Sequence, residues 1–193
     1  MPHSKREIVL KCARQLFEQD GFHATGIDRI LEKSGVAKMT LYNNFGSKDQ
    51  LIAEVLSRSS HTHIERMKEY ILIASSDPYE QILAVFVALG DRFQDPEFCG
   101  CMFQAAIAEF PDFDSEPAKA ALAHHQRIIE VFFKLCTDAN LSNVDQLSRK
   151  LALLASGSSC IARQTKTRQP ADDALFIAEI LLERASISVP TPV

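Results

Sequence analysis

The chain has 193 residues, of which 46% are hydrophobic, and a formal net charge of −4. This length allows one domain, or two small units, with enough apolar surface to bury a core, and the acidic balance argues against a protein coated with nucleic acid. Apolar runs stay well below the roughly 18 residues that a membrane span requires.

The charge is unevenly distributed. Residues 1–50 carry 8 Lys and Arg against 6 Asp and Glu, whereas the remainder carries 13 against 19. A locally basic N-terminal part fits a small nucleic-acid contact, and it also fits ordinary scatter. Five irregularly spaced cysteines do not suggest a disulfide framework, and the charged start MPHSKREIVLKC is unlike a secretory signal. We therefore expect a cytoplasmic protein.

Apolar residues recur every three or four positions, which predicts an all-α fold. The first helix is expected over about 4–19, with Gly21 as its stop. Thr25 is expected to cap a second, short helix that Gly35 ends, and a third helix is expected over about 38–44.

Capping signals locate the later helices. Ser47 with Gln50 forms a capping box for a helix that extends to about residue 73, and Asp77-Pro78 begins the next one. The same Asp-Pro pair at 95–96 comes before the segment FCGCMFQAAIAEF. Three more helices are expected over about 116–138, 144–165 and 171–186, followed by a proline-rich tail, SVPTPV.

Two short helices joined by a glycine turn are typical of a helix-turn-helix. Gly35 tolerates positive φ in the turn, and the side chains that would pack the two helices are Ile27, Ile30, Leu31, Val36 and Leu41. The side chains left exposed on the second helix are Lys38, Met39, Thr40, Tyr42, Asn43 and Asn44. Such a helix fits a DNA major groove about 12 Å wide, while Thr25 and Lys48 flank it where donors reach phosphates.

Two stretches, Thr25-Gly-Ile-Asp-Arg-Ile and SGVAKMTLYNNFGSKDQL from Ser34 to Leu51, closely resemble the DNA-binding region of the tetracycline-repressor (TetR) family of regulators. Ile8 to Phe17, followed by Gly21-Phe22, matches the first helix of that family, so the resemblance covers about the first quarter of the chain. The departures are Leu31 and Ser34 for a frequent alanine, Met39 for a frequent glycine, and Asn43-Asn44 for an aromatic-histidine type pair. Because the last two departures lie at exposed positions, the operator sequence does not carry over from relatives.

The resemblance implies roles for individual residues. Tyr42, Lys48 and Thr25 would hold phosphates, whereas Lys38, Met39, Thr40 and Asn43 would face bases or the adjacent backbone. The alternatives are a packing aromatic at Tyr42 and a solvated charge at Lys48. The implied organisation is a helix-turn-helix DNA-binding domain over 1–46, a ligand-binding and dimerisation domain over 47–187, and a loose tail over 188–193.

Phenylalanines are frequent in the middle third of the chain. Regulators that this sequence resembles keep a ligand cavity among their central helices, which implies an apolar pocket lined by Phe86, Phe93, Cys101, Phe103 and Phe132, with Gln104 as a polar anchor. The alternative is that these residues are ordinary core.

The last two helices have wide apolar faces, with small residues over 155–159 that permit close helix approach. A face wider than one core requires suggests a partner, and a four-helix bundle of two copies is the dimer mode of the resembling family. The alternative is internal packing.

We expect the protein to be a ligand-responsive transcriptional regulator, with repression favoured over activation. It would bind double-stranded operator DNA as a homodimer and be released by a small-molecule effector. Neither Cys99 and Cys101 nor His124 and His125 have the helical spacing of a metal pair, so we expect no metal, cofactor or catalytic site. A thiol-based redox-sensing regulator stays open. Less favoured are a helical protein-binding adaptor and an enzyme that uses Cys101 or His124 with Glu109.

Overall fold

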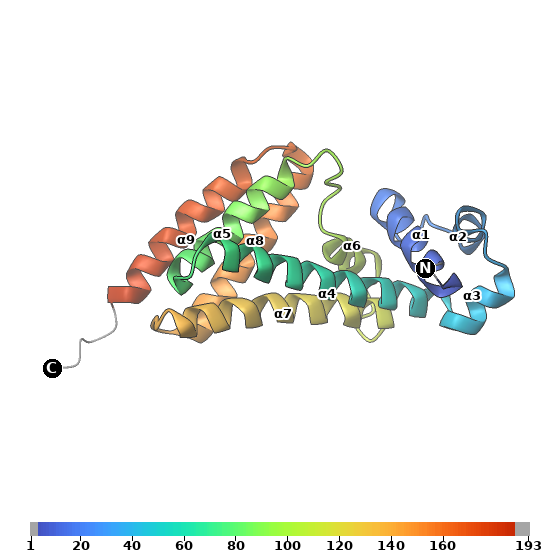
Figure 1. The fold of residues 1–193 in the computed structure, drawn as a ribbon, viewed down its shortest axis with the longest axis horizontal. Helices are drawn as coiled ribbons and strands as arrows, with labels where there is room; N and C mark the ends of the chain where they lie inside the picture. The colour runs from blue at the N-terminus through green and yellow to red at the C-terminus, as the bar shows by residue number, and fades with distance from the viewer. Residues whose placement is uncertain (1–3, 188–193) are drawn as a thin grey trace. The chain divides into compact units, whose positions relative to one another are not determined.

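The computed structural model describes residues 4–187, and every regular element in that range is an α-helix (Figure 1). In chain order the helices are α1 (Lys5–Asp20), α2 (Ile27–Ser34), α3 (Lys38–Phe45), α4 (Lys48–Ala74), α5 (Pro78–Phe93), α6 (Met102–Glu109), α7 (Glu116–Asp138), α8 (Val144–Thr165) and α9 (Gln169–Ile187). The all-α prediction is confirmed. The loose tail expected over 188–193 lies outside the described residues.

Side-chain caps begin several of these helices. Ser47 Oγ accepts a hydrogen bond from the Gln50 amide at 3.1 Å, as the capping box predicts. Asp77 Oδ1 accepts from the Tyr79 amide at 3.0 Å, with Pro78 at the first helical position. These bonds satisfy amides that have no partner inside the helix, which explains why the ends of α4 and α5 were predictable.

The second Asp-Pro pair does not begin a helix. Asp95 Oδ1 accepts from the Glu97 amide at 2.9 Å, and the Asp95 carbonyl accepts from the Phe98 amide at 2.9 Å, which closes only a turn. Helix α6 starts later, at Met102, after Gly100 with its positive φ of 101°. Asp95-Pro96 therefore marks a turn before this segment and not the first residues of α6.

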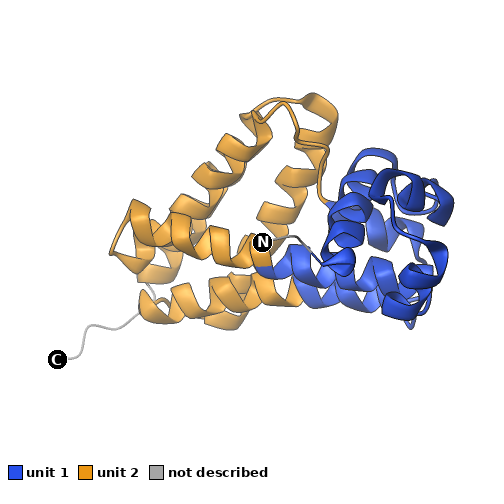
Figure 2. Ribbon diagram, turned by 45° about the vertical axis from the view of Figure 1, so that its right-hand side comes forward, with its two compact units in different colours: residues 1–61, 102–124 blue, residues 62–101, 125–193 orange. Residues whose placement is uncertain are grey.

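The chain divides into two compact units (Figure 2). Unit 1 comprises the residues up to 61 together with 102–124, and unit 2 comprises 62–101 together with the residues from 125 onward. Helices α4 and α7 therefore contribute to both. This division differs from the boundary between residues 46 and 47 expected from the resemblance, which is a functional boundary and stays a prediction.

Unit 1 has an aromatic and aliphatic core around α1. Phe17 and Phe22 lie 5.1 Å apart between ring centroids, and Phe22 meets Phe110 edge-on at 6.0 Å. Ile30 and Leu41 are completely buried, so α2 and α3 are held by apolar contacts as well as by the turn between them.

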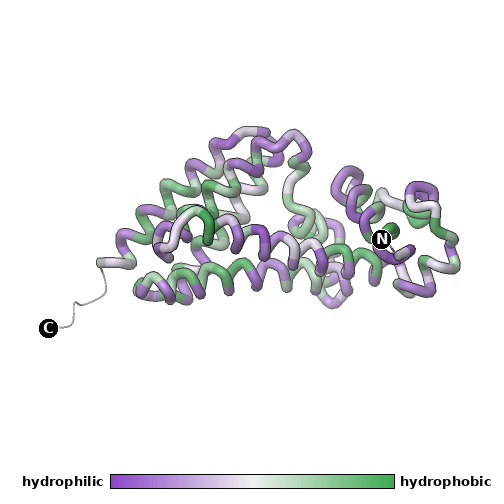
Figure 3. The backbone as a smooth tube through the Cα atoms, in the orientation of Figure 1, coloured by the Kyte–Doolittle hydropathy of each residue, from purple (hydrophilic) through white to green (hydrophobic). Residues whose placement is uncertain are grey.

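Unit 2 is built around buried side chains of α5, α7, α8 and α9. Phe86 and Phe132 stack at 5.9 Å, and Leu151 and Leu182 are completely buried in the same cluster. Hydrophobic and hydrophilic residues alternate along α4 and α7 (Figure 3), as helices with one buried face require. Within the described residues, none of the helices combines the length and the apolar character needed to cross a bilayer.

Candidate nucleic-acid interface

Helices α2 and α3 meet at a turn that depends on a left-handed residue. Gly35 adopts φ 67° and ψ 17°, and its amide donates to the Leu31 carbonyl at 2.9 Å to close α2. Val36 and Leu41 are buried in the angle after the turn. The prediction of a positive-φ glycine followed by two packing residues is confirmed.

The opposite face of α3 is exposed. Met39 retains 72% of its surface, and the side chains of Lys38, Tyr42 and Asn43 are also exposed. Thr40 is partly buried, and its carbonyl accepts a hydrogen bond from the Asn44 side chain at 2.7 Å. The face therefore offers one cation, one phenol and one amide beside an apolar side chain. Their proposed contacts with bases and phosphates stay a prediction.

The two flanking residues differ from each other. Thr25 is completely buried, and its hydroxyl donates to the Gly21 carbonyl at 2.7 Å and to the Leu16 carbonyl at 3.4 Å. It does not cap α2, whose N-cap is Gly26 with no side-chain hydrogen bond, so the capping prediction is wrong. Lys48 is partly buried at the start of α4, and its ammonium group donates to the His23 carbonyl at 3.4 Å.

An ion-pair network joins α1 to α4 within unit 1. Arg6 contacts Glu54 at 2.5 Å, Arg58 contacts the second oxygen of Glu54 at 3.2 Å, and Arg58 also holds Glu7 at 2.6 Å. These hydrogen bonds to Glu7 are the main reason that the pKa of Arg58 is raised. Because all four groups are partly exposed, we expect the network to fix geometry more than to add stability.

One contact of this unit has no signal in the sequence. Glu109, at the end of α6, accepts hydrogen bonds from the amides of Phe22 and His23, in the turn between α1 and α2. A contact across more than 80 residues has no local pattern that could reveal it.

The residues expected to bind an effector lie in four places. Phe86 and Phe132 belong to the main core cluster of unit 2, and Phe93 packs on Phe98 at 5.1 Å in a separate cluster. Cys101 is partly buried in the segment before α6.

The remaining two lie on α6, in unit 1. The ring of Phe103 stacks on that of the buried His124 at 3.5 Å, and Gln104 is partly buried. His124 Nδ1 shares a hydrogen bond with Ser60 Oγ at 2.9 Å. Buried aromatics of this kind are what a core needs as well as what a pocket offers, and the role of all six residues in ligand binding stays a prediction.

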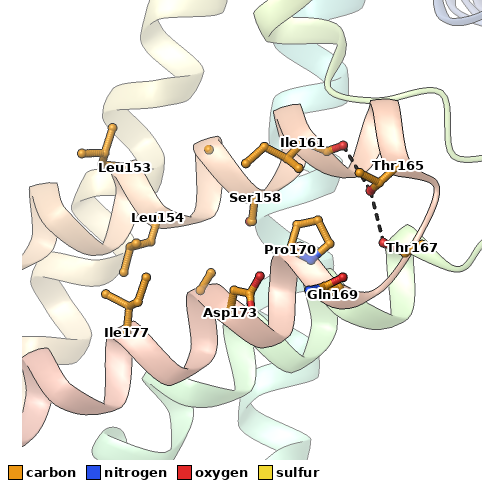
Figure 4. A pocket seen from close by; sticks show the side chains of 12 residues that line it. Leu153, Leu154, Ser158, Ile161, Thr165, Thr167, Gln169, Pro170, Asp173 and Ile177 are labelled. Atoms are coloured by element: carbon orange, nitrogen blue, oxygen red, sulfur yellow. Dashed lines mark hydrogen bonds between the residues drawn. The ribbon is translucent and has the colours of Figure 1, made fainter.

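Helices α8 and α9 present an exposed apolar surface, which we call the α8–α9 face. Its large exposed side chains are Leu153, Ile161, Phe176, Ile177 and Ile180. A hollow of about 450 Å³ opens on this face (Figure 4). Leu153, Leu154 and Ile177 lie at one end of the hollow, and Thr165 and Gln169 lie at the other.

The cysteines differ in their surroundings. Cys99 and Cys160 are exposed, whereas Cys136 is buried, and this burial raises the pKa of its thiol to about 12. No disulfide joins the five cysteines, all of which fall in the described range. Within residues 4–187 no three His, Cys, Asp or Glu side chains gather in a way that could hold a metal ion.

The N-terminal helices are similar to those of known DNA-binding regulators. Residues 9–55 match the family model of bacterial regulatory proteins of the tetR family. The chain is 32% identical to the HTH-type transcriptional regulator LmrA of Bacillus subtilis over 124 residues, which are 60% of this chain and 62% of LmrA. It thus spans less than two thirds of that relative.

Two other relatives differ in the direction of regulation that their names give. The HTH-type transcriptional repressor KstR2 of Mycolicibacterium smegmatis is 27% identical over 58% of this chain and 56% of its own length. The HTH-type transcriptional activator FasR of the same species is 29% identical over 82% of this chain and 65% of its own length.

Solved structures match almost the whole chain. The regulator sav143 of Streptomyces avermitilis has a TM-score of 0.84 at 26% identity, covering 95% of this chain and 99% of its own. SCO4454, a TetR-family transcriptional regulator from Streptomyces coelicolor, has a TM-score of 0.83 at 27% identity, covering 94% and 96%. A CifR variant, solved with a 26 bp double-strand operator DNA, shares the fold with a TM-score of 0.75 at 22% identity over 95% and 98% of the chains. The N-terminal helices of this chain thus match the tetR family of bacterial regulatory proteins over residues 9–55, and the chain as a whole shares its fold with solved regulators of that family.

Proposed function

We propose that the protein is a ligand-responsive repressor, which binds a palindromic operator as a homodimer and leaves it when a small-molecule effector binds. The observation that carries the DNA-binding part is the exposed face of α3, where Lys38, Tyr42 and Asn43 stand clear of a buried Leu41. A short helix with a packed inner face and polar outer face suits the major groove. The fold shared with a CifR variant solved in complex with operator DNA supports the same proposal.

The proposed homodimer forms through α8 and α9. The α8–α9 face exposes five large apolar side chains, more than a solitary surface helix pair usually carries. One recognition helix reads few bases, whereas two helices about 34–36 Å apart read a palindrome, so pairing is also what specific binding requires.

The proposed effector binds among the central helices and shifts the population of dimer geometries. A ligand shifts such an equilibrium only as far as it prefers one state. Repression is the direction suggested by KstR2, whereas the activator FasR is the counterexample among the relatives.

The DNA contacts can be tested with a duplex that the purified wild-type protein selects from a random library. Lys48→Ala should weaken binding to every duplex and lower the salt slope by ~1, because one phosphate contact is lost. Asn43→Ala should cost ~1–3 kcal/mol on the selected duplex and relax its base preference, with the salt slope unchanged. Lys134→Ala, on α7, removes the same charge from an exposed Lys134–Asp138 pair and serves as the control.

Affinity measured by fluorescence anisotropy at several salt concentrations decides the outcome. If both Lys48→Ala and Asn43→Ala behave like Lys134→Ala, the assignment of α3 as the recognition helix is wrong. A reporter gene under the selected operator then separates the directions of control: repression rises with protein level for a repressor, and expression rises for an activator.

A further inference from the structure

Glu109 holds the turn between α1 and α2 through two neighbouring backbone amides. The Phe22 amide donates to Oε1 at 3.1 Å, and the His23 amide donates to Oε2 at 2.6 Å. Both oxygens of one carboxylate are therefore engaged by a single turn. Hydrogen bonds to an ionised acceptor are roughly twice as strong as neutral ones, so this contact is strong for a partly exposed group.

The end of α6 and the turn are also interlocked in other ways. His23 Nε2 donates to the Glu109 carbonyl at 2.6 Å, and the Phe110 ring lies 4.8 Å from the His23 ring. Gly21 has φ +87°, and a Cβ placed there would lie 2.9 Å from Glu109 Oε1. The turn therefore accommodates the carboxylate because the preceding residue is a glycine.

The same turn contacts a residue of the proposed DNA interface. The ammonium group of Lys48 donates to the His23 carbonyl at 3.4 Å. The backbone of His23 thus donates a hydrogen bond to the Glu109 carboxylate and accepts one from the Lys48 ammonium group. A displacement of the turn changes where the Lys48 ammonium group finds its acceptor.

We propose that Glu109 is a positioning residue for DNA binding, which fixes the turn between α1 and α2 and, through His23, the Lys48 ammonium group. The inference rests on the proposed DNA-binding function. It makes the last residue of α6 part of the DNA-binding apparatus, although it lies 61 positions after Lys48 in the sequence.

The direction in which Glu109→Gln changes DNA affinity distinguishes a positioning role from an effect of net charge. Glu109 is an acid, so neutralising it should strengthen the attraction between the protein and phosphates if only the net field matters. Glutamine keeps the shape of glutamate, but only one of its two terminal atoms accepts a hydrogen bond, and its amide group meets the second backbone donor. A positioning role therefore predicts weaker binding for Glu109→Gln.

The test compares full-length Glu109→Gln with Glu116→Gln on the duplex selected by the wild-type protein. Glu116 also lies in unit 1, loses the same charge, and its described contact is an ion pair with Lys119 at 3.7 Å. We expect Glu109→Gln to lower affinity by ~10-fold, the loss of one charge-assisted hydrogen bond, and to reduce the salt slope by ~1. Adding Glu109→Gln to Lys48→Ala should change little further, because both act on one contact.

Several results would overturn the proposal. One is a lower melting temperature for Glu109→Gln with affinity and salt slope unchanged at a temperature where the protein is folded, which makes Glu109 structural only. Another is tighter binding, equal to that of Glu116→Gln. If Glu109→Gln does not fold, His23→Ala replaces it, since it removes the Nε2 contact and keeps both amides. It should lower affinity by ~3-fold, and no loss counts against the proposal. Failure of the DNA-binding function itself would already appear as absent binding by the wild type.

Discussion

The α8–α9 face gives the most direct test of the proposed assembly, through Leu153→Ala. Leu153 lies on α8 and keeps 69% of its surface exposed in the single chain. Its truncation should therefore leave the folding of one chain almost unchanged. If the α8–α9 face is the contact between two copies, the same truncation removes apolar surface from the interface twice, because each copy contributes its own Leu153.

The magnitude follows from the exposed fraction. Full burial of a leucine side chain is worth about 1.5–3 kcal/mol, so burying the exposed 69% of Leu153 is worth about 1–2 kcal/mol per copy. Two copies give about 2–4 kcal/mol, which corresponds to roughly a 30- to 800-fold increase in the dissociation constant of the dimer. The larger value applies if the partner cannot relax into the space that is left.

The measurement is the dimer dissociation constant from sedimentation equilibrium over a wide range of concentrations. Leu72→Ala is a matched control, because Leu72 is another helical leucine, on α4, with 67% of its surface exposed. Thermal unfolding of both variants verifies that each chain still folds. A dissociation constant for Leu153→Ala that equals the wild-type value, or that changes no more than for Leu72→Ala, refutes the α8–α9 dimer.

Two further predictions concern stability and its dependence on pH. Gly35→Ala should lower the free energy of unfolding in urea by about 1–2 kcal/mol, because a φ of 67° is unfavourable for a residue with a Cβ. No atom lies within 4 Å of the new Cβ, so a steric clash adds nothing to this value. Gly26→Ala, at φ −76° and equally open, should change the stability little, and equal effects of the two substitutions would contradict the backbone explanation. Burial, followed by the charges of Arg92 and Arg66, lowers the pKa of His63 from 6.5 to about 4. The unfolded chain then takes up this proton below about pH 6.5 and the folded chain only near pH 4, so stability should fall by about 2 kcal/mol between pH 7 and pH 4.5. His63→Gln should remove that part of the pH dependence in urea titrations, and an unchanged pH profile would show that His63 does not cause it.

Most of the helices and the exposed face of α3 were readable from the sequence. Ser47 and Asp77 cap their helices through bonds to amides two or three residues away, and Gly35 ends α2 through its own backbone freedom. These determinants act within one helical turn, so the sequence contains all of their partners. The exposed face of α3 followed for the same reason, because helical periodicity separates Leu41 from Lys38 and Asn43.

Two residues with capping side chains do not start a helix. Thr25 has the type of side chain that caps a helix, yet its hydroxyl turns to carbonyls of Leu16 and Gly21. The Asp95-Pro96 pair has the same letters as Asp77-Pro78, but only the latter continues into a helix. In each case the local preference is worth about 1 kcal/mol, which tertiary packing can exceed.

The sequence by itself thus determined where most helices of the described chain run, α6 excepted, and which side chains α3 presents. Only the tertiary structure decided which phenylalanines share a cluster, that Leu153 and Ile177 remain uncovered beside one hollow, and that Glu109 reaches the turn before α2. The physical reason is range. Hydrogen bonds within a helix join residues four apart, whereas burial and the carboxylate contact depend on how helices far apart in the chain pack against each other.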